Sequence, residues 1–160
     1  MPRKKYPLES LARMKKDRVE AKARELGAAI STREAREAER GRKEADRDAA
    51  RASANVVRTG ERAALEKGDL RVIDLARGNV WETRVKVEDA GRTREVDDAR
   101  TAEEKARATE ARAKSDVAGS RAESESVERH RERWKTALRK GEEAREEEAM
   151  ADVVRPKRTR

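Results

Sequence analysis

Apolar and small residues recur every 11 positions along the first part of the chain. Two rows follow this interval: Leu8, Val19, Ile30, Gly41, Ala52 and Ala63, and beside them Ala12, Ala23, Ala45 and Val56, broken once at Glu34. Leu11, Met14 and Leu26 widen the stripe. Because 11 residues complete three turns of an α-helix, such a stripe stays nearly straight along one face. The spacing predicts a long first helix with little left-handed supercoil.

The stripe is thin beyond Ile30, where it consists mostly of Ala and Gly. It fits a solvated single helix supported by pairs such as Glu20 with Arg24 and Glu39 with Lys43, each contributing about 0.2–0.5 kcal/mol. It also fits a seam whose small side chains let a partner helix approach closely. The persistence of the spacing favours the seam.

The second part of the chain carries a seven-residue repeat. Gly68 is suited to end the first helix and Asp69 to cap the second. The most apolar stretch of the protein follows: Leu70, Ile73, Leu75, Val80, Trp81, Val85 and Val87. Farther on, residues seven apart are mostly small: Ala99, Ala106, Ala113, Ser120, Val127, Trp134 and Gly141, flanked by Ala102, Val117 and Leu138. This pattern predicts a two-helix coiled coil, with the second helix ending before Pro156.

Two glycines compete for the turn between the helices. In an antiparallel hairpin, the numbers of facing residues add to twice the turn centre. A turn at Gly68 places Leu8 near Arg129, so that the larger side chains at the two ends cover one another. A turn at Gly60 places Leu8 beside Arg112 and leaves the later apolar residues without a partner. We therefore expect the bend near Gly68, with a looser loop beginning at Gly60 as the variant.

The predicted fold class is all-α, a long antiparallel two-helix coiled-coil hairpin without a globular core. We expect residues 1–160 to form one such hairpin, with helix one at about 7–66, the bend at about 60–69, helix two at about 69–151 and a basic tail at 152–160.

Composition favours a long helical protein over a globular or a disordered one. With 48% charged, 34% hydrophobic and 2% aromatic residues, the 160-residue chain has too few large apolar side chains to fill an ordinary globular core. Disordered chains share this low hydrophobicity but are rich in Pro, Ser and Gly. This chain has three Pro and is dominated by Ala, Glu, Arg and Lys, which are strong helix formers.

A net charge of +8 raises the question of nucleic-acid binding. The 34 acidic residues are interspersed among the 42 basic ones, and a mixed surface attracts a polyanion weakly. Only Arg3–Lys5 and Arg155–Arg160 are purely basic, which fits either solvated tails or a contact with an acidic partner surface. The absence of Cys suits a reducing compartment, and no apolar run approaches the roughly 20 residues that span a bilayer. We expect a cytoplasmic protein without membrane insertion.

The sequence lacks the motifs of common catalytic sites. It contains no phosphate-binding loop, no dinucleotide-binding turn, no H-E-x-x-H pair and no nucleophile elbow. The single histidine, His130, is surrounded by charged residues, which favours a solvent-facing position over acid-base catalysis. The acidic runs at Glu142–Glu143 and Glu146–Glu148 are better interpreted as solvated faces than as metal sites. We expect no enzyme, no catalytic residue, no cofactor and no metal.

Trp81 and Trp134 are two of very few aromatic residues in the chain. Each is expected either to cap the seam where the helices separate or to anchor a partner, because Trp is enriched in binding hot spots. The sequence leaves both alternatives open.

Short stretches at the ends and the break in the middle resemble a known family. These are Tyr6-Pro7-Leu8-Glu9-Ser10-Leu11, the break near residues 60–69, and Glu146-Glu147-Glu148-Ala149-Met150-Ala151. They are similar to the small coiled-coil stalk proteins of bacterial type III export machines, flagellar and injectisome alike. The resemblance implies a stalk whose paired helix ends enter the hexameric export ATPase. It also implies that the stalk reaches the cytoplasmic domain of the export gate, peripheral to the inner membrane, and export chaperones are a further implied partner.

Residue by residue, the resemblance implies two binding surfaces. The ATPase-facing surface would contain Leu8, Leu11, Arg13, Met14, Lys15, Lys16, Arg18, Arg131, Arg133, Trp134, Leu138 and Arg145. The gate-facing surface would contain Leu70, Ile73, Val80 and Trp81. This sequence is poorer in aromatic residues after the bend than the flagellar members. The competing functions are a basic coiled-coil scaffold and a nucleic-acid-binding rod.

Overall fold

Two long helices make up the protein. The computed structural model describes the backbone of residues 5–154 and the side chains of residues 5–151. Helix α1 spans Glu9–Lys67 and helix α2 spans Val72–Val154, and the described residues contain no strand. The all-α prediction is confirmed. Arg3, Lys4 and the basic run Arg155–Arg160 lie outside the described residues.

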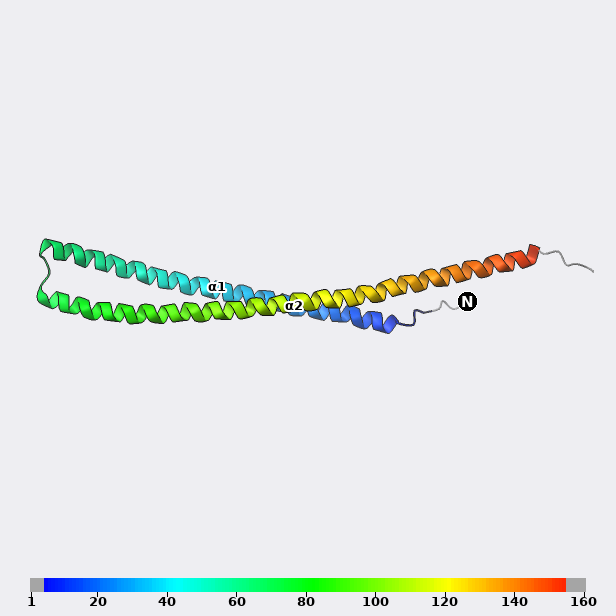
Figure 1. Cartoon of the computed structure of the whole chain (residues 1–160), viewed down its shortest axis with the longest axis horizontal. Coiled ribbons are helices and arrows are strands. Elements are labelled where there is room, and N and C mark those ends of the chain that lie inside the picture. Colours follow the sequence, from blue (N-terminus) through cyan, green and yellow to red (C-terminus); the bar gives the residue numbers. More distant parts are fainter. Residues whose placement is uncertain (1–4, 155–160) are drawn as a thin grey trace, which may run out of the picture. The chain divides into compact units, whose positions relative to one another are not determined.

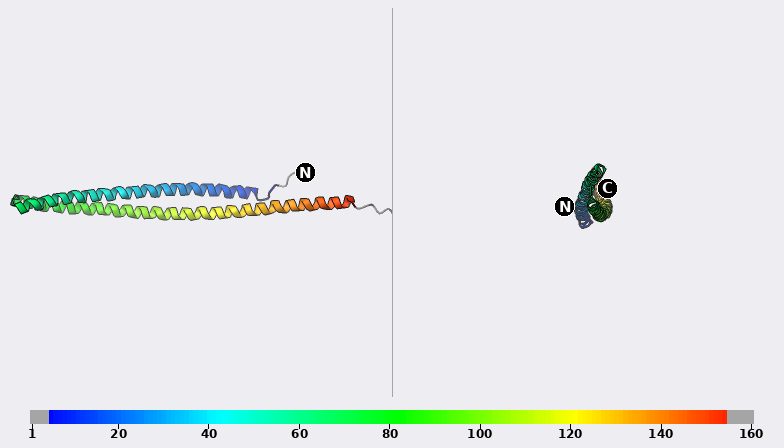
Figure 2. Two further views of the ribbon diagram at one scale, coloured as in Figure 1. Left: turned by 90° about the horizontal axis from the view of Figure 1, so that it is seen from above. Right: turned by 90° about the vertical axis from the view of Figure 1, so that its left-hand side faces the viewer.

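Contacts divide the chain into two compact units. The turn unit is Gly27–Arg112, and the terminal unit contains the chain up to Leu26 and from Ala113 onward. Within each unit α1 and α2 lie side by side and run antiparallel (Figures 1 and 2). Tyr6 bonds to His130 in the terminal unit and Glu44 bonds to Arg100 in the turn unit, so the numbers of paired residues add to 136 and 144. Both pairs centre on residues 68 to 72, in agreement with the predicted hairpin.

Gly68 makes the turn. Its φ of 76° lies in the left-handed region, where glycine carries no steric penalty. The N–H of Gly68 donates to the carbonyl of Leu65 and the N–H of Asp69 to that of Ala64, both at 3.0 Å, a Schellman motif that satisfies the last carbonyls of α1. Gly60 lies inside α1, so the looser loop from residue 60 is not formed.

Asp69 does not cap the second helix, contrary to the sequence-based prediction. Its N–H completes the end of α1, and α2 begins three residues later. The cap is Arg71, whose N–H donates to the Asp74 carboxylate at 3.1 Å and whose carbonyl accepts the first helical hydrogen bonds. Asp74 thus takes the acidic position of a capping box, which satisfies a free N–H at the helix start.

Along α2, the predicted seven-residue repeat faces α1. In the turn unit Val96, Ala99, Glu103 and Ala106 are buried, and in the terminal unit Val117 and Ser120 are buried. Gly141 is exposed, because α2 continues past the start of α1 in the terminal unit (Figure 1).

Along α1, the 11-residue stripe is wrong for the turn unit. Ile30 is half-buried, but the later members Gly41, Ala45, Ala52, Val56 and Ala63 are all exposed. One row of buried and half-buried residues recurs every seven positions instead: Ala12, Val19, Leu26, Arg33, Arg40, Arg47 and Ala54. A partner with a seven-residue repeat selects the same repeat on α1, because only a matched repeat keeps the two faces in contact. The seam on α1 therefore includes three arginines.

The turn allows a paired glycine test. Gly68→Ala is expected to lower the free energy of unfolding by about 1 kcal/mol, because a Cβ is strained at positive φ. Gly60→Ala is the matched control: it lies in a helix with no atom within 4 Å of an added Cβ. It is expected to raise stability by about 0.8–1 kcal/mol. Urea unfolding followed by circular dichroism measures both, and equal stability of the two variants would place the turn elsewhere.

Candidate partner-binding surfaces

An aromatic cluster lies at the end of the terminal unit. Tyr6 is buried, its hydroxyl and His130 Nδ1 share a hydrogen bond of 2.7 Å, and its ring centroid lies 5.5 Å from that of Trp134 in an edge-on arrangement. Trp134 is half-buried. It therefore covers the seam where α1 begins, as the capping alternative expects, and His130 takes part in the cluster although its side chain is exposed.

Ion pairs also join the two helices of the terminal unit. Arg131 bonds to Glu9 at 2.8 Å and Lys15 to Glu123 at 2.6 Å. The hydrogen bond from Lys15 holds the pKa of the Glu123 carboxyl below its usual value, and the charge of Arg18, 3.8 Å away, acts in the same direction. These pairs fix the register of the terminal unit, because each joins residues more than 100 positions apart.

The twelve residues expected to face the ATPase all lie in the terminal unit, but they divide into two groups. The half-buried group faces the seam: Leu11, Lys15, Arg131, Trp134 and Leu138. The exposed group is Leu8, Arg13, Met14, Lys16, Arg18, Arg133 and Arg145. Arg145 lies on the part of α2 that continues past α1. The exposed group is open to a partner, and Arg131, Trp134 and Leu138 of the half-buried group line a groove on the terminal unit.

The four residues expected to face the gate lie next to the turn. Val80 is 72% exposed and Ile73 is 56% exposed, whereas Leu70 and Trp81 are half-buried. Leu70 lines a groove between the two helices together with Leu65 and Leu75. This end of the turn unit therefore carries apolar side chains on its surface, as the sequence predicted.

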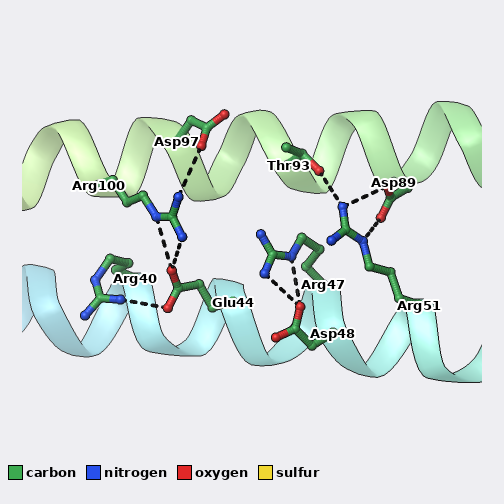
Figure 3. A network of polar contacts seen from close by, with 9 residues as sticks. All are labelled: Arg40, Glu44, Arg47, Asp48, Arg51, Asp89, Thr93, Asp97 and Arg100. Atoms are coloured by element: carbon green, nitrogen blue, oxygen red, sulfur yellow. Dashed lines mark hydrogen bonds and ion pairs between the residues drawn. The ribbon is translucent and has the colours of Figure 1, made fainter.

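Sequence reasoning missed a charged seam in the middle of the turn unit. Arg40 bonds to both Glu44 and Glu103, and Glu44 also accepts two hydrogen bonds from Arg100 (Figure 3 shows the Glu44 side). Glu103 is only 5% exposed and is also paired with Arg107 at 2.6 Å. The hydrogen bond from Arg40 holds the pKa of the Glu103 carboxyl below its usual value.

Other ion pairs between the two helices lie on either side of Arg40 along α1. Arg33 bonds to Glu110 at 2.9 Å, and Arg51 bonds to Asp89 at 2.6 Å and reaches Thr93 (Figure 3). The hydrogen bond from Arg51 lowers the pKa of the Asp89 carboxyl. The signal was present in the sequence, because Arg33 and Arg40 are seven apart on one helix and Glu103 and Glu110 are seven apart on the other.

The charged seam also bears on the nucleic-acid alternative. Arginines that bond to carboxylates across the helices are not available as an uninterrupted basic face for phosphates. Neither α1 nor α2, over the described residues, holds an apolar stretch able to cross a bilayer. Within the same residues no group of three or more His, Asp or Glu side chains is arranged to hold a metal ion.

Comparison with known protein families identifies the family of this chain. Residues 3–154, which are nearly the whole sequence, match the model of the YscO-like protein family. The chain belongs to the YscO-like family. Searches of curated proteins and of solved structures find no match. The YscO-like assignment confirms the resemblance drawn from the two chain ends and the central break, and associates the protein with type III secretion as a structural component.

Proposed function

We propose that this chain is the non-enzymatic central stalk of a type III protein export apparatus. In this role the terminal unit inserts into the hexameric export ATPase and the turn unit contacts the cytoplasmic domain of the export gate. The protein would then be cytoplasmic and peripheral to an inner-membrane export complex, with export chaperones as further partners. Family membership over residues 3–154 carries the proposal.

The terminal unit has features that suit insertion into a ring. Its two helices are tied together by the Tyr6 cluster and by the Glu9–Arg131 pair, so the end stays slender. Exposed cations surround it, among them Arg13, Lys16 and Arg133. Such cations suit a ring lined by carboxylates, and the attraction should weaken as salt is added.

ATP hydrolysis tests this part of the proposal. The purified protein is mixed with its export ATPase at less than one chain per hexamer, and we expect faster hydrolysis and co-migration of the two proteins. The double variant Lys16→Glu/Arg133→Glu should weaken binding at least tenfold at low salt. Arg94→Glu, an exposed cation of the turn unit, is the matched control and should bind as the parent does. Neither stimulation nor co-migration of the parent would remove the ATPase role.

The gate contact is tested separately. Trp81→Ala is expected to impair export while leaving helix content and ATPase binding intact, because Trp81 lies in the turn unit and outside the terminal unit. Secretion of an export substrate by cells carrying the variant is the measurement. A normal export phenotype would contradict the gate assignment without affecting the ATPase result.

A further inference from the structure

The first turns of α2 carry a second, mostly apolar row, on the side that faces away from α1. Residues spaced alternately by three and four form this row, here called the outer seam: Ile73, Ala76, Val80, Thr83, Val87 and Ala90. All six are exposed, Val87 to 69%. Alternate spacing by three and four is the pattern of a coiled-coil seam. The outer seam has no partner among the described residues.

The face toward α1 is already occupied by other residues. Glu82 bonds to Arg58 at 2.6 Å and Asp89 bonds to Arg51 at 2.6 Å, while Val85 is half-buried between them. At about 100° per residue, Val80 and Val87 lie on the opposite side of α2 from these contacts. Packing against α1 therefore cannot explain why the outer seam is apolar.

The borders of the outer seam are mainly basic. Arg77 and Arg84 lie along one border and Lys86 along the other, and Glu88 on the first border is already bonded to Arg84 and Arg92. Residues that border a coiled-coil seam choose the partner through charge. A second copy of this chain would bring Arg77 and Arg84 against the same cations. A helix with acidic borders would be attracted.

We propose that the outer seam binds one amphipathic helix, whose apolar face has coiled-coil spacing and whose borders are acidic, as a third helix beside α2. The inference rests on the proposed function only for the identity of the partner, which would then be a segment of the export gate. The apolar row supplies the contact area, and the cations on its borders supply the selection among partners.

The test uses designed peptides, because they carry no export-gate sequence. Two fluorescently labelled peptides of three heptads share Leu and Ile at the seam positions; one has Glu at the bordering positions and the other has Lys. We expect the Glu peptide to bind at least tenfold more tightly than the Lys peptide at low salt, with the difference shrinking as salt is added. Fluorescence anisotropy measures both affinities.

Two exposed valines provide the variants. Val80→Asp should weaken binding of the Glu peptide at least tenfold, because it places a carboxylate in the seam and repels the acidic borders. Val56→Asp, on α1 and 73% exposed, is the matched control and should leave binding unchanged. Circular dichroism checks that both variants keep the parent's helix content.

Several outcomes would overturn the inference. These are equal binding of the two peptides, no binding of the Glu peptide, and a Val80→Asp variant that binds as the parent does. Self-association of the parent that Val80→Asp abolishes would assign the outer seam to a second copy instead. If the peptide binds but the gate domain does not, the gate assignment fails and the outer seam stands. If the gate domain binds but the peptide does not, the proposal of a helical partner for the outer seam fails, and the gate assignment stands.

Discussion

Val96→Ala is expected to lower the free energy of unfolding by about 2 kcal/mol, which is a large fraction of the stability of a chain with so small a core. Val96 is completely buried and is the largest fully buried side chain among the described residues. Removing two methyl groups loses their transfer free energy and leaves a cavity between rigid helices.

Val87→Ala is the matched control for this prediction. It makes the same chemical change on the same helix, but on the exposed side. Its effect should be within a few tenths of a kcal/mol, and in the stabilising direction, because Ala has a higher helix propensity than Val. Urea unfolding measures both variants. Equal losses would show that Val96 does not lie in the seam.

Arg40→Met is expected to be the most destabilising change in the charged seam. It leaves the carboxylate of Glu103, which is nearly inaccessible to water, with Arg107 as its remaining ion-pair partner. A buried charge that loses its partner costs far more than the pair itself contributed. Arg36→Met, which removes a more exposed arginine bonded to Glu39, should have little effect.

The double variant Arg40→Met/Glu103→Leu tests this cause. Replacing both partners by apolar side chains should recover most of the lost stability, because neither charge is then left in the seam. If the double variant is as unstable as Arg40→Met, the loss comes from packing of the arginine stem and not from the Glu103 carboxylate that has lost Arg40. Denaturant midpoints of the parent, Arg40→Met, Glu103→Leu and the double variant complete the cycle.

The ion pair between Arg40 and Glu103 also predicts how the stability of the protein depends on pH. The pKa of Glu103 is lowered in the folded state, chiefly by the hydrogen bond from Arg40, and Arg100 likewise lowers the pKa of Glu44. The stability that these carboxylates contribute is therefore present above their unfolded pKa of about 4.3 and is lost as the pH falls through the lower folded values. When the pH is lowered below about 4, the thermal midpoint of unfolding should decrease. Arg40→Met/Glu103→Leu should flatten that fall.

The candidate surfaces were predictable to different degrees. The apolar residues after the turn were visible in the sequence, because a cluster such as Ile73 and Val80 stands out in so polar a chain. The expected ATPase surface was divided by the fold: Lys15 and Arg131 bond across the helices and are half-buried. Which side of a helix an arginine occupies depends on the partner's register, and composition does not reveal it.

Tyr6 shows the same limit at the end of the terminal unit. Its pairing with Trp134 follows once the turn is placed at Gly68, yet the sequence offers no separate sign that a residue ahead of α1 folds against α2. The outer seam is the opposite case. Its spacing is in the sequence, but it becomes a separate surface only when Glu82 and Asp89 are seen to occupy the face toward α1.

By itself the sequence determined that the protein is helical, that it bends near Gly68, and that α2 carries a seven-residue repeat. These follow from local causes, namely helix propensity, the left-handed conformation open to glycine, and the period of the small residues. Only the tertiary structure decided which face of α1 meets α2. Two periods compete along α1, and contact with the repeat of α2 selects seven over 11, because arginines such as Arg33 and Arg40, which bond to carboxylates of α2, can occupy a seam as well as small residues can.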